Sequence, residues 1–389
     1  MAAFADEKIE VYLGPKDLQA PDDLEQVIVD FMAGAQKSLD IAVQELDSEP
    51  IAQAILDARW RGVSVSLYVE QSYLREERLP SVTPQGDETD EEARRRVQWA
   101  AEGGLSENRR ILDALLASTI DVKADYNPNI FHQKFAIRDY RGRATESSAL
   151  LSGSANFTVT DCHTNLNHVF VFHDARICGE YWQEFQEIRQ GHFGRDGHGQ
   201  VPRAYNLAGV PVKVLFAPDH TPELEIVKQM LRCKKRLDFA IFTFAGSSAI
   251  DDAMLMLADA DRKVRGALDP GQAAHEWAAP REPGAAPKWL NRERIELYLP
   301  KRDGDFAGFR KLHHKLMVID DAIAIAGSFN YTAPANEYND ENIFVVGSPF
   351  PELPTTQGGP TDLAECAAIT GHLRQEIERI IAQSAPYEP

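Results

Sequence analysis

The sequence predicts an α/β protein made of two homologous halves, and three observations support this prediction. A histidine–lysine motif occurs twice, a strand–helix–strand pattern precedes each copy, and a glycine-rich segment separates the copies. A long repeat of this kind indicates a duplicated structural unit. The chain has 389 residues, of which 43% are hydrophobic, so it can bury a substantial core in one or two domains.

The repeat has two parts in each copy. Both copies read His-x-Lys-x-x-x-x-Asp, followed by Gly-Ser-x-Asn, an aromatic residue and Thr, and they occupy residues 132–139 with 153–158 and residues 313–320 with 327–332. The first copy has a longer polar turn after its aspartate, which predicts a hairpin tip between two strands. The repeat therefore accepts a loop insertion without losing its motifs.

The segments ahead of each copy predict a βαβ unit. Apolar runs or alternation indicate strands, and apolar residues at helical spacing indicate a helix between them. The strand, helix and strand are expected at 38–44, 49–60 and 63–69 in the first half, and at 237–244, 249–260 and 264–269 in the second. This order predicts that the two strands of each unit pair in parallel.

A connector predicts the domain organisation. Residues 190–200 contain four glycines, so we place an N-terminal half at 1–200 and a C-terminal half at 201–389. Two further segments, 75–96 and 272–288, are rich in charge, proline, glycine or alanine and read as insertions. Either insertion could form the rim of a cleft.

Composition excludes several classes of protein. The 60 acidic and 41 basic residues give a net charge of −19, which disfavours a general nucleic-acid coat or a membrane-surface protein unless positive charge gathers in one cleft. The four cysteines lie far apart without a Cys-x-x-Cys pair, so we expect packed, reduced thiols. Without a signal-like N-terminus or a long apolar stretch, we expect a cytoplasmic location and no stable membrane insertion.

The motif residues suggest phosphoryl chemistry. Residues two apart on a strand point to the same face, so His132 should share a face with Lys134, and His313 with Lys315. A neutral imidazole can attack phosphorus, while ammonium and amide groups can hold the oxygens of a phosphodiester. The neighbouring pair His313-His314 should point to opposite faces, which argues against a metal site. We therefore expect neither a metal nor a cofactor.

The repeated motif resembles the signature of the phospholipase D superfamily, and the likeness covers nearly the whole chain. It implies two phospholipase D-like α/β/α halves, with mixed sheets flanked by helices, related by a pseudo-twofold axis. It also implies one shared active site and a covalent phosphohistidine intermediate.

The resemblance assigns roles to the motif residues. It implies that His132 is the nucleophile and His313 the general acid. The other residues that it implies for phosphate binding or support of the pocket are Lys134, Lys315, Asn156, Asn330, Ser154 and Ser328. Asp139 and Asp320 lie at the far ends of their strands, so we expect them to be structural.

The two halves differ downstream of the asparagines. The second copy carries Glu341, a common residue in the superfamily, where the first carries Asn167. A carboxylate beside an imidazole favours the imidazolium, whereas an amide only orients the ring, so the two histidines should have unequal pKa values. The sequence leaves open which histidine Glu341 meets. Arg310 and Lys311, just before His313, are the candidate basic patch for an anionic substrate.

The wording of the motifs favours a nuclease. The segments after each asparagine resemble the nuclease members of the superfamily, and the aspartate and Arg-Ser pair frequent in cardiolipin synthases are missing. We expect a metal-independent hydrolase that cleaves nucleic acid. A phospholipase D or phosphatidyltransferase that acts on phospholipid is the first alternative. A non-catalytic nucleic-acid-binding subunit is the second, and a protein partner in a larger complex is also considered.

Overall fold

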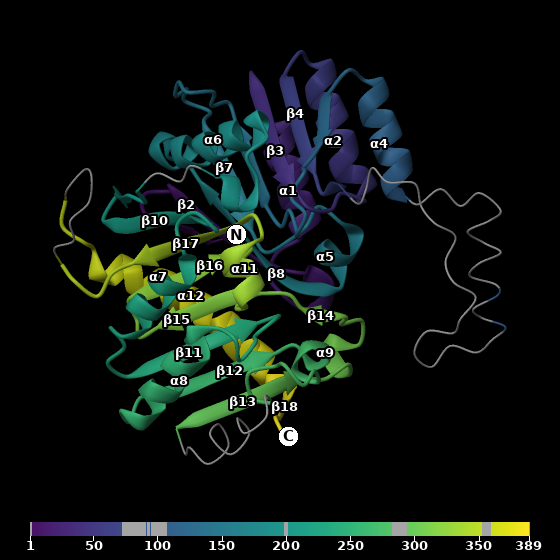
Figure 1. The fold of residues 1–389 in the computed structure, drawn as a ribbon. Coiled ribbons are helices and arrows are strands. Elements are labelled where there is room, and N and C mark those ends of the chain that lie inside the picture. Colours follow the sequence, from purple (N-terminus) through teal and green to yellow (C-terminus); the bar gives the residue numbers. More distant parts are fainter. Residues whose placement is uncertain are drawn as a thin grey trace.

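The computed structural model describes residues 2–71, 91, 94, 107–197, 201–281, 294–351 and 359–388. In this part of the chain the strands form two nine-stranded sheets, one for each half, with helices on both faces (Figure 1). This is the predicted arrangement of two phospholipase D-like α/β halves. Most of the insertion at 75–96, and residues 282–288 of the insertion at 272–288, lie outside the described residues.

The first sheet contains the predicted parallel unit. Its strands are β1 (Ala2–Phe4), β2 (Ile9–Gly14), β3 (Ser38–Val43), β4 (Ser64–Val69), β5 (Asp121–Ala124), β6 (Lys134–Arg138), β7 (Ala149–Gly153) and β8 (Asn165–Phe172). Their order is β1-β2-β8-β7-β6-β3-β4-β5, with β3 parallel to β4 and antiparallel to β6. Every residue of β3 is buried, as expected for a central strand that is covered on both faces.

The second sheet repeats this plan. Its strands are β9 (Ala204–Leu207), β10 (Val210–Ala217), β11 (Arg236–Ile241), β12 (Lys263–Leu268), β13 (Ile295–Pro300), β15 (Lys315–Ile319), β16 (Ile323–Gly327), β17 (Glu341–Gly347) and β18 (Ser384–Pro386). The run β10-β17-β16-β15-β11-β12-β13 matches β2-β8-β7-β6-β3-β4-β5 strand by strand. One short strand crosses over: β14 (Lys311–Leu312) of the second half pairs with β8 of the first sheet.

Helices complete the layers on each side of the sheets. They are α1 (Leu24–Ala33), α2 (Glu49–Trp60), α4 (Glu107–Ala117), α5 (Val159–His163), α6 (Ala175–Gln190), α7 (Pro222–Met230), α8 (Ala249–Asp259), α9 (Pro270–Ala273), α11 (Ala333–Glu337) and α12 (Leu363–Ala382). The predicted helix α2 begins after Ser48, whose hydroxyl accepts a hydrogen bond from the N–H of Ile51 as an N-cap.

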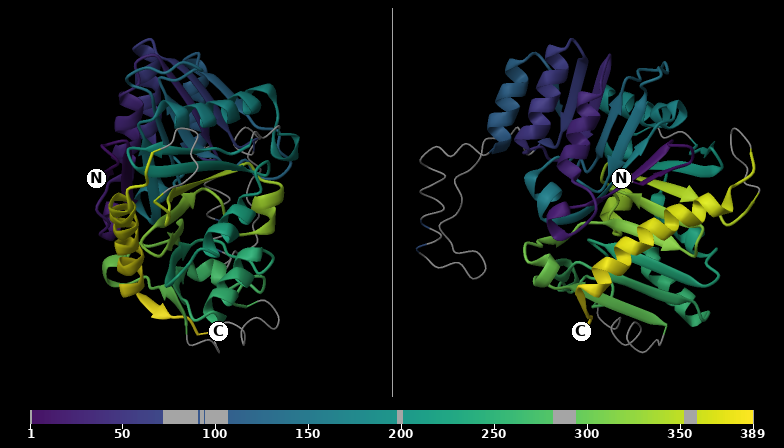
Figure 2. Two further views of the ribbon diagram at one scale, coloured as in Figure 1. Left: turned by 90° about the vertical axis from the view of Figure 1, so that its left-hand side faces the viewer. Right: turned by 180° about the vertical axis from the view of Figure 1, so that it is seen from behind.

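Three apolar cores hold these layers together. One outer core lies under α1, α2 and α4, and another lies under α7 and α8. The central core joins the two halves, because it combines residues of α6 and α12 with facing strands of both sheets. Within it Phe170 of β8 meets Phe344 of β17 with ring centroids 4.8 Å apart. Figure 2 shows α12 running along the second sheet towards the N-terminal half, where Glu365 accepts a hydrogen bond from the N–H of Ala5.

The four cysteines are all free and buried, as predicted. No helix within the described ranges is long and apolar enough to cross a membrane. The sheets divide between β8 and β9, but β14 and α12 both cross that division. The boundary at residue 200 between two domains therefore stays a prediction.

Candidate active site

The two motifs meet where the halves join. The residue before each histidine pairs with the opposite half: Phe131 forms a bridge with Asp340, and Leu312 in β14 pairs with β8. The backbone N–H of His132 then donates to the carbonyl of Asp340 at 3.0 Å, and the N–H of His313 donates to a carbonyl of β8 at 2.9 Å. Each half thus fixes the position of the other half's histidine.

This pairing corrects one expectation about the strands. We expected each histidine to lie on a strand with its lysine, but β6 begins at Lys134 and β15 at Lys315. The preceding residues do not join these strands because they pair across the interface instead. Each lysine still reaches back to its histidine. The Nζ atoms of Lys134 and Lys315 donate to the backbone oxygens of His132 and His313 at 3.0 and 2.9 Å.

The partner of Glu341, which the sequence left open, is the histidine of the other half. Nδ1 of His132 lies 2.6 Å from Oε2 of Glu341. The hydroxyl of Ser328 donates to the same oxygen at 2.7 Å, and the carboxylate is fully buried. The glutamate is therefore held in one orientation against His132.

The second imidazole has an amide in the equivalent place. Nδ1 of His313 lies 3.0 Å from Oδ1 of Asn167, which also accepts a hydrogen bond from the hydroxyl of Ser154 at 2.7 Å. The Nδ2 group of Asn167 donates to the backbone oxygen of Asp161 at 3.0 Å. These bonds fix which end of the amide faces His313, so Nδ1 of this imidazole carries the proton.

A carboxylate that was not predicted from the sequence lies beside His313. Oδ2 of Asp161 lies 3.6 Å from Nδ1 of His313 and accepts a hydrogen bond from the N–H of Asn156 at 2.7 Å. Asp161 sits three residues after Thr158, the N-cap of α5, whereas the matching position of the second copy is Ala335. The only sign of Asp161 in the sequence is that the two copies of the repeat differ at this position. Both imidazoles have a carboxylate nearby, but the two carboxylates come from different positions in the repeat.

Burial and the two lysines set the charges in the site. Burial lowers the pKa of both His132 and His313 well below the ordinary value, and the charges of Lys134 and Lys315 lower it further. Burial also lowers the pKa of Lys134 to about 8 and that of Lys315 well below its usual range. Each histidine responds to the lysine of the opposite half, so the two motifs form one electrostatic site.

The His132–Glu341 pair is best described as sharing a proton rather than as two full charges. Burial raises the pKa of Glu341 to about 8, against the effect of the lysines, and disfavours the imidazolium of His132. When the proton lies on Nδ1, Nε2 keeps its lone pair and can act as a nucleophile.

Several polar groups in the site are left for a ligand. Within the described part of the chain, the buried atoms Oδ1 of Asn156, Oδ1 of Asn330 and Oε1 of Glu341 have no hydrogen-bond partner. An asparagine amide can turn over and present its NH₂ group to a phosphate oxygen instead. Unpaired buried polar atoms are costly unless something binds them. The two asparagine amides, once turned, fit a site that receives an anion, whereas the carboxylate oxygen of Glu341 does not bind one.

The side wall of the site is aromatic and basic. The ring of Phe242 is partly buried and lies 4.8 Å from the ring of His313. Nζ of Lys315 is 4.9 Å and Nζ of Lys311 5.6 Å from the centre of the Phe242 ring. Lys311 thus borders the site, whereas the neighbouring Arg310 is exposed and its carbonyl accepts a hydrogen bond from Arg302.

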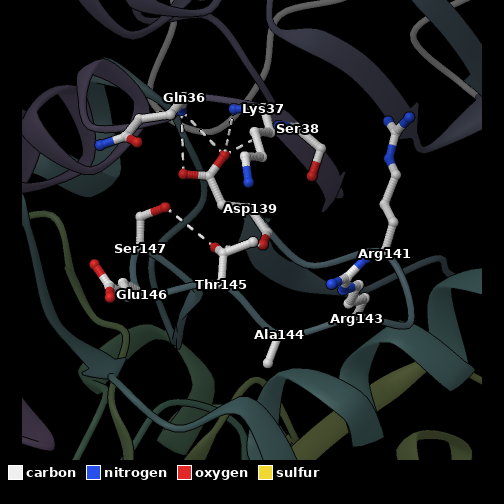
Figure 3. A pocket seen from close by; sticks show the side chains of 10 residues that line it. All are labelled: Gln36, Lys37, Ser38, Asp139, Arg141, Arg143, Ala144, Thr145, Glu146 and Ser147. Atoms are coloured by element: carbon white, nitrogen blue, oxygen red, sulfur yellow. Dashed lines mark hydrogen bonds between the residues drawn. The ribbon is translucent and has the colours of Figure 1, made fainter.

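The motif aspartates act at the far ends of β6 and β15, as predicted. Figure 3 shows the carboxylate of Asp139 bonded to the backbone N–H groups of Gln36, Lys37 and Ser38 in a surface hollow. Asp320 accepts hydrogen bonds from the N–H groups of residues 234–236 in the same way. Both aspartates therefore tie the end of their own strand to the start of a neighbouring strand, β3 or β11, and do not face the histidines.

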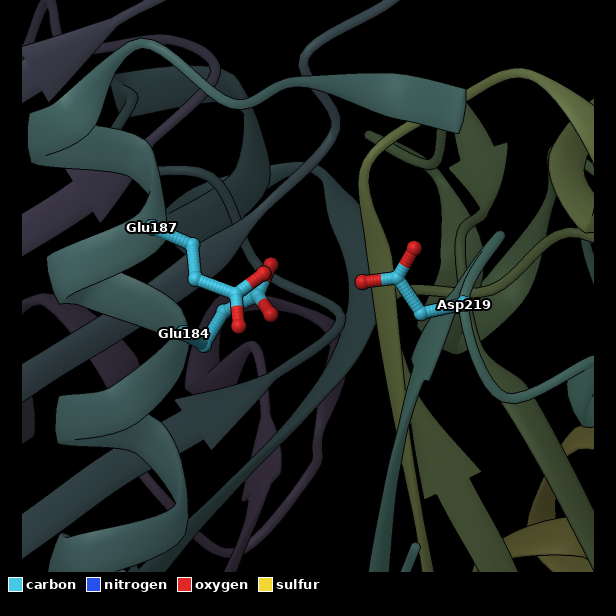
Figure 4. A group of neighbouring side chains, drawn as sticks. All are labelled: Glu184, Glu187 and Asp219. Carbon is cyan, nitrogen blue, oxygen red and sulfur yellow. The ribbon is translucent and has the colours of Figure 1, made fainter. Parts of the chain in front are cut away.

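One group of carboxylates among the described residues lies close enough to share a cation. The ligand atoms of Glu184 and Glu187 on α6 and of Asp219 after β10 lie within 4.8 Å of one another (Figure 4). Burial raises the pKa of Glu184 well above its ordinary value, and the nearby acids add to this. A proton on Glu184 therefore relieves the repulsion. These residues were not predicted as a site, and nothing else at the cluster points to a ligand.

Comparisons with known proteins agree with this geometry. The family model described as the cardiolipin synthase, PLD-like domain matches residues 28–189 and 226–357. The mitochondrial cardiolipin hydrolases of Xenopus tropicalis and Xenopus laevis are 25% and 28% identical over 40% and 35% of this chain. The match covers 56% and 60% of those proteins, so the chain spans less than two thirds of the length of these relatives.

Solved structures show the same fold over most of the chain. The superposition on the phosphatidylserine synthase of Haemophilus influenzae covers 100% of this chain and 89% of the synthase chain, with a TM-score of 0.62 and 13% identity. The superposition on the polyphosphate kinase of Porphyromonas gingivalis covers 95% of this chain and 56% of the kinase chain, with a TM-score of 0.56 and 11% identity. At such low identity the likeness concerns the fold alone. The family model, however, matches both halves and most of the chain, and the chain therefore belongs to the phospholipase D superfamily.

Proposed function

We propose that this chain is a metal-independent nuclease that cleaves phosphodiester bonds, with single-stranded nucleic acid preferred, through a phosphohistidine on His132. The observation that carries the proposal is the pair of imidazoles at the junction of the halves. Each has a hydrogen-bonded partner at Nδ1 and a buried lysine beside it. This is the arrangement that a covalent nucleophile and a separate acid require.

The proposed reaction uses the two Nε2 atoms, because each Nδ1 atom is already held by Glu341 or Asn167. Nε2 of His132 attacks phosphorus, and a nitrogen–phosphorus bond forms as the bond to the leaving oxygen breaks. His313 gives that oxygen a proton, and afterwards takes one from the water that displaces His132 from phosphorus. The pKa of His313 is depressed by burial and by the lysines, so the negative charge of a bound phosphodiester must help to protonate it. Lys134 and Lys315 offer ammonium N–H groups to the phosphate oxygens.

The wall beside His313 supports a nucleic-acid substrate. Residues 301–311 carry four basic and two acidic residues in a chain whose net charge is −19, and Lys311 at their end borders Phe242. A partly exposed aromatic ring next to cations suits a nucleobase and its phosphates. His132 and His313 are only 6% and 5% exposed. A flexible single strand can present its backbone to so narrow an opening more easily than a duplex can.

A phospholipid is the second candidate substrate, for a separate reason. The loop that leads into His132 exposes Tyr126 and Ile130, at 81% and 45%, where acyl chains could contact them. The curated relatives that match the chain are named cardiolipin hydrolases.

One experiment ranks the candidates. The protein would be incubated in EDTA with labelled single-stranded DNA, duplex DNA, RNA and vesicles that contain cardiolipin, with His132→Ala as the control. We expect cleavage of single strands that EDTA leaves unchanged and that the control lacks, since no metal takes part in the proposed steps. Cleavage of lipid alone would select the second candidate. Strict dependence on an added divalent ion would overturn the mechanism, and salt-dependent binding without cleavage would indicate a binding subunit.

A further inference from the structure

Two buried histidines that the proposed reaction does not use lie at the junction of the halves. Nδ1 of His168 is 3.0 Å from Nδ1 of His314, and their ring planes are within 4° of each other. Nε2 of His168 accepts a hydrogen bond from the backbone N–H of Gly327 at 3.2 Å. Nε2 of His314 lies 3.4 Å from Oε1 of Glu376 on α12. Both histidines have no exposed surface, and Glu376 has 2%.

The backbone fixes the direction of every proton in this chain of contacts. A peptide N–H can only donate, so Nε2 of His168 is an acceptor and its proton lies on Nδ1. That proton is donated to Nδ1 of His314, whose own proton must then lie on Nε2 and point at Glu376. Burial alone would raise the pKa of Glu376, but the hydrogen bonds from Arg379 and His314 outweigh it and lower the pKa to about 2. The series ends on an ionised carboxylate.

We propose that His168, His314 and Glu376 form a directional hydrogen-bond chain that positions both catalytic imidazoles, an inference that rests on the roles proposed for His132 and His313. His314 directly follows His313, and His168 directly follows Asn167, the partner of His313. Gly327, which donates to His168, directly precedes Ser328. The hydroxyl of Ser328 holds Glu341 against His132. One series of hydrogen bonds therefore adjoins the supports of both imidazoles.

The first half contains a version of this contact that cannot take up a proton. There Gln133 occupies the place of His314, and its Oε1 accepts a hydrogen bond from Nδ2 of Asn342 at 2.7 Å. Asn342 follows Glu341 just as His168 follows Asn167. The repeat thus contains the same cross-half contact twice, once made of amides and once made of imidazoles. Only the imidazole version can take up a proton.

A further proton would break the imidazole version. A proton added to Nδ1 of His314 would face the N–H of His168, and a proton added to Nε2 of His168 would face the N–H of Gly327. The charges that face the pair are Lys315 for His168, and Glu376, Arg379 and Lys315 for His314. Burial lowers the pKa of both rings, and only Glu376 acts in the opposite direction, so the pair stays neutral until the solution is acidic.

Nitrogen-15 NMR on histidine-labelled full-length protein tests the chain without a substrate. Signals would be assigned with His168→Asn and His314→Gln. We expect two neutral rings near neutral pH, with the proton on Nδ1 of His168 and on Nε2 of His314. A different pair of tautomers, or a charged ring, would overturn the proposal. This readout stands apart from the proposed function, because it holds or fails whatever the protein cleaves.

Cleavage of a labelled single-stranded oligonucleotide, whose leaving oxygen needs a proton from His313, tests the positioning role. We expect His314→Ala to lower kcat by about 10- to 100-fold with little change in KM, because small displacements of catalytic groups are that costly. The double variant His168→Asn/His314→Gln, which copies the amide contact of the first half, should recover most of this loss. Its kcat should decline at a lower pH than that of the wild type, because only the catalytic histidines are then left to take up protons. Glu378→Gln, an exposed change on the same helix, is the control.

Unchanged kcat in folded His314→Ala would refute the positioning role, as would a double variant whose kcat declines at the same acidic pH as that of the wild type. If His314→Ala does not fold, the double variant and the NMR experiment still decide. A wild-type protein that hydrolyses no diester would count against the proposed function, while the tautomers would still report on the hydrogen-bond chain.

Discussion

Nδ1 of His132 in the first half lies 2.6 Å from Oε2 of Glu341 in the second, whereas Nδ1 of His313 faces the amide oxygen of Asn167 at 3.0 Å. A carboxylate can share or stabilise a proton on the ring, and an amide can only orient it. Each histidine is oriented by a residue that follows the motif of the opposite half. Neither half therefore contains a complete site.

The first prediction concerns Glu341. Glu341→Gln keeps the shape of the side chain but removes its charge, so His132 loses the carboxylate that stabilises positive charge on the ring during attack. We expect kcat to fall by about 100-fold or more, a typical loss for an acid–base partner. Glu337→Gln, an exposed change on α11, should leave kcat unchanged. Turnover of Glu341→Gln within a few-fold of the wild type would show that the carboxylate only fills space.

The repeat made the fold and the core of the site predictable, because both depend on local pattern. Two copies of one motif predicted two matching sheets, and the strand–helix–strand order predicted the parallel pairs. The contacts across the junction were not predictable in the same way. Which histidine Glu341 meets depends on how the halves pack, and no periodicity within one half encodes that.

Departures from the repeat carried information that the motif did not. Asp161 lies near His313, but Ala335 stands at its place in the second copy, so a search for shared residues overlooks it. His314 occupies the unspecified middle position of the His-x-Lys motif, so the motif assigns it no role. Its partner His168 is 146 residues away, and the contact becomes visible only in the folded chain.

The second prediction concerns the buried ammonium of Lys134. Lys134→Met fills the same space without a charge, so turnover should fall by about 100-fold or more as a phosphate contact is lost. Stability should not fall with it, because the lowered pKa of about 8 means that burial disfavours the charged ammonium of Lys134 in the folded protein. Lys123→Met, at an exposed lysine, is the matched control for turnover and melting temperature.

The same variant gives a pH test. Burial lowers the pKa of Lys134 to about 8 in the folded protein, while an unfolded chain has a lysine pKa of about 10.4. Between these values the unfolded chain binds more protons, so the free energy of unfolding of the wild type should rise with pH across this window. Urea unfolding should show a smaller rise for Lys134→Met. An equal rise in both proteins would contradict the lowered pKa.

The third prediction concerns Asp340, which joins the halves. Its carboxylate accepts hydrogen bonds from the N–H of Gly194 at 2.7 Å and from Nδ2 of Asn127 at 2.7 Å, and burial raises its pKa to about 7. The folded state therefore holds a proton that the unfolded chain releases near about pH 4. The protonated carboxyl group of Asp340 therefore stabilises the folded state fully below about pH 4, and this stabilisation is lost as the pH rises through about 7.

Asp340→Asn mimics the protonated carboxyl group and should flatten this dependence. We expect the melting temperature of the wild type to fall more between about pH 5 and about pH 8 than that of the variant. The comparison uses differential scanning calorimetry in buffers of equal ionic strength. A variant with the same pH dependence as the wild type would mean that Asp340 is ionised throughout.

The last prediction decides which imidazole attacks. If His313 protonates the leaving oxygen, His313→Ala should lose far less rate on a diester of p-nitrophenol, whose leaving group needs no proton, than on an oligonucleotide. His132→Ala should be inactive on both substrates because the covalent step itself is missing. Acid-quenched wild-type protein should carry label from the retained phosphoryl group on His132, detected by mass spectrometry. The structure gives a reason for this order: Glu341 can stabilise positive charge on His132 as the nitrogen–phosphorus bond forms, whereas the amide of Asn167 leaves His313 to exchange its proton with the leaving group. Label on His313, or activity of His132→Ala with the activated diester, would reverse the two roles.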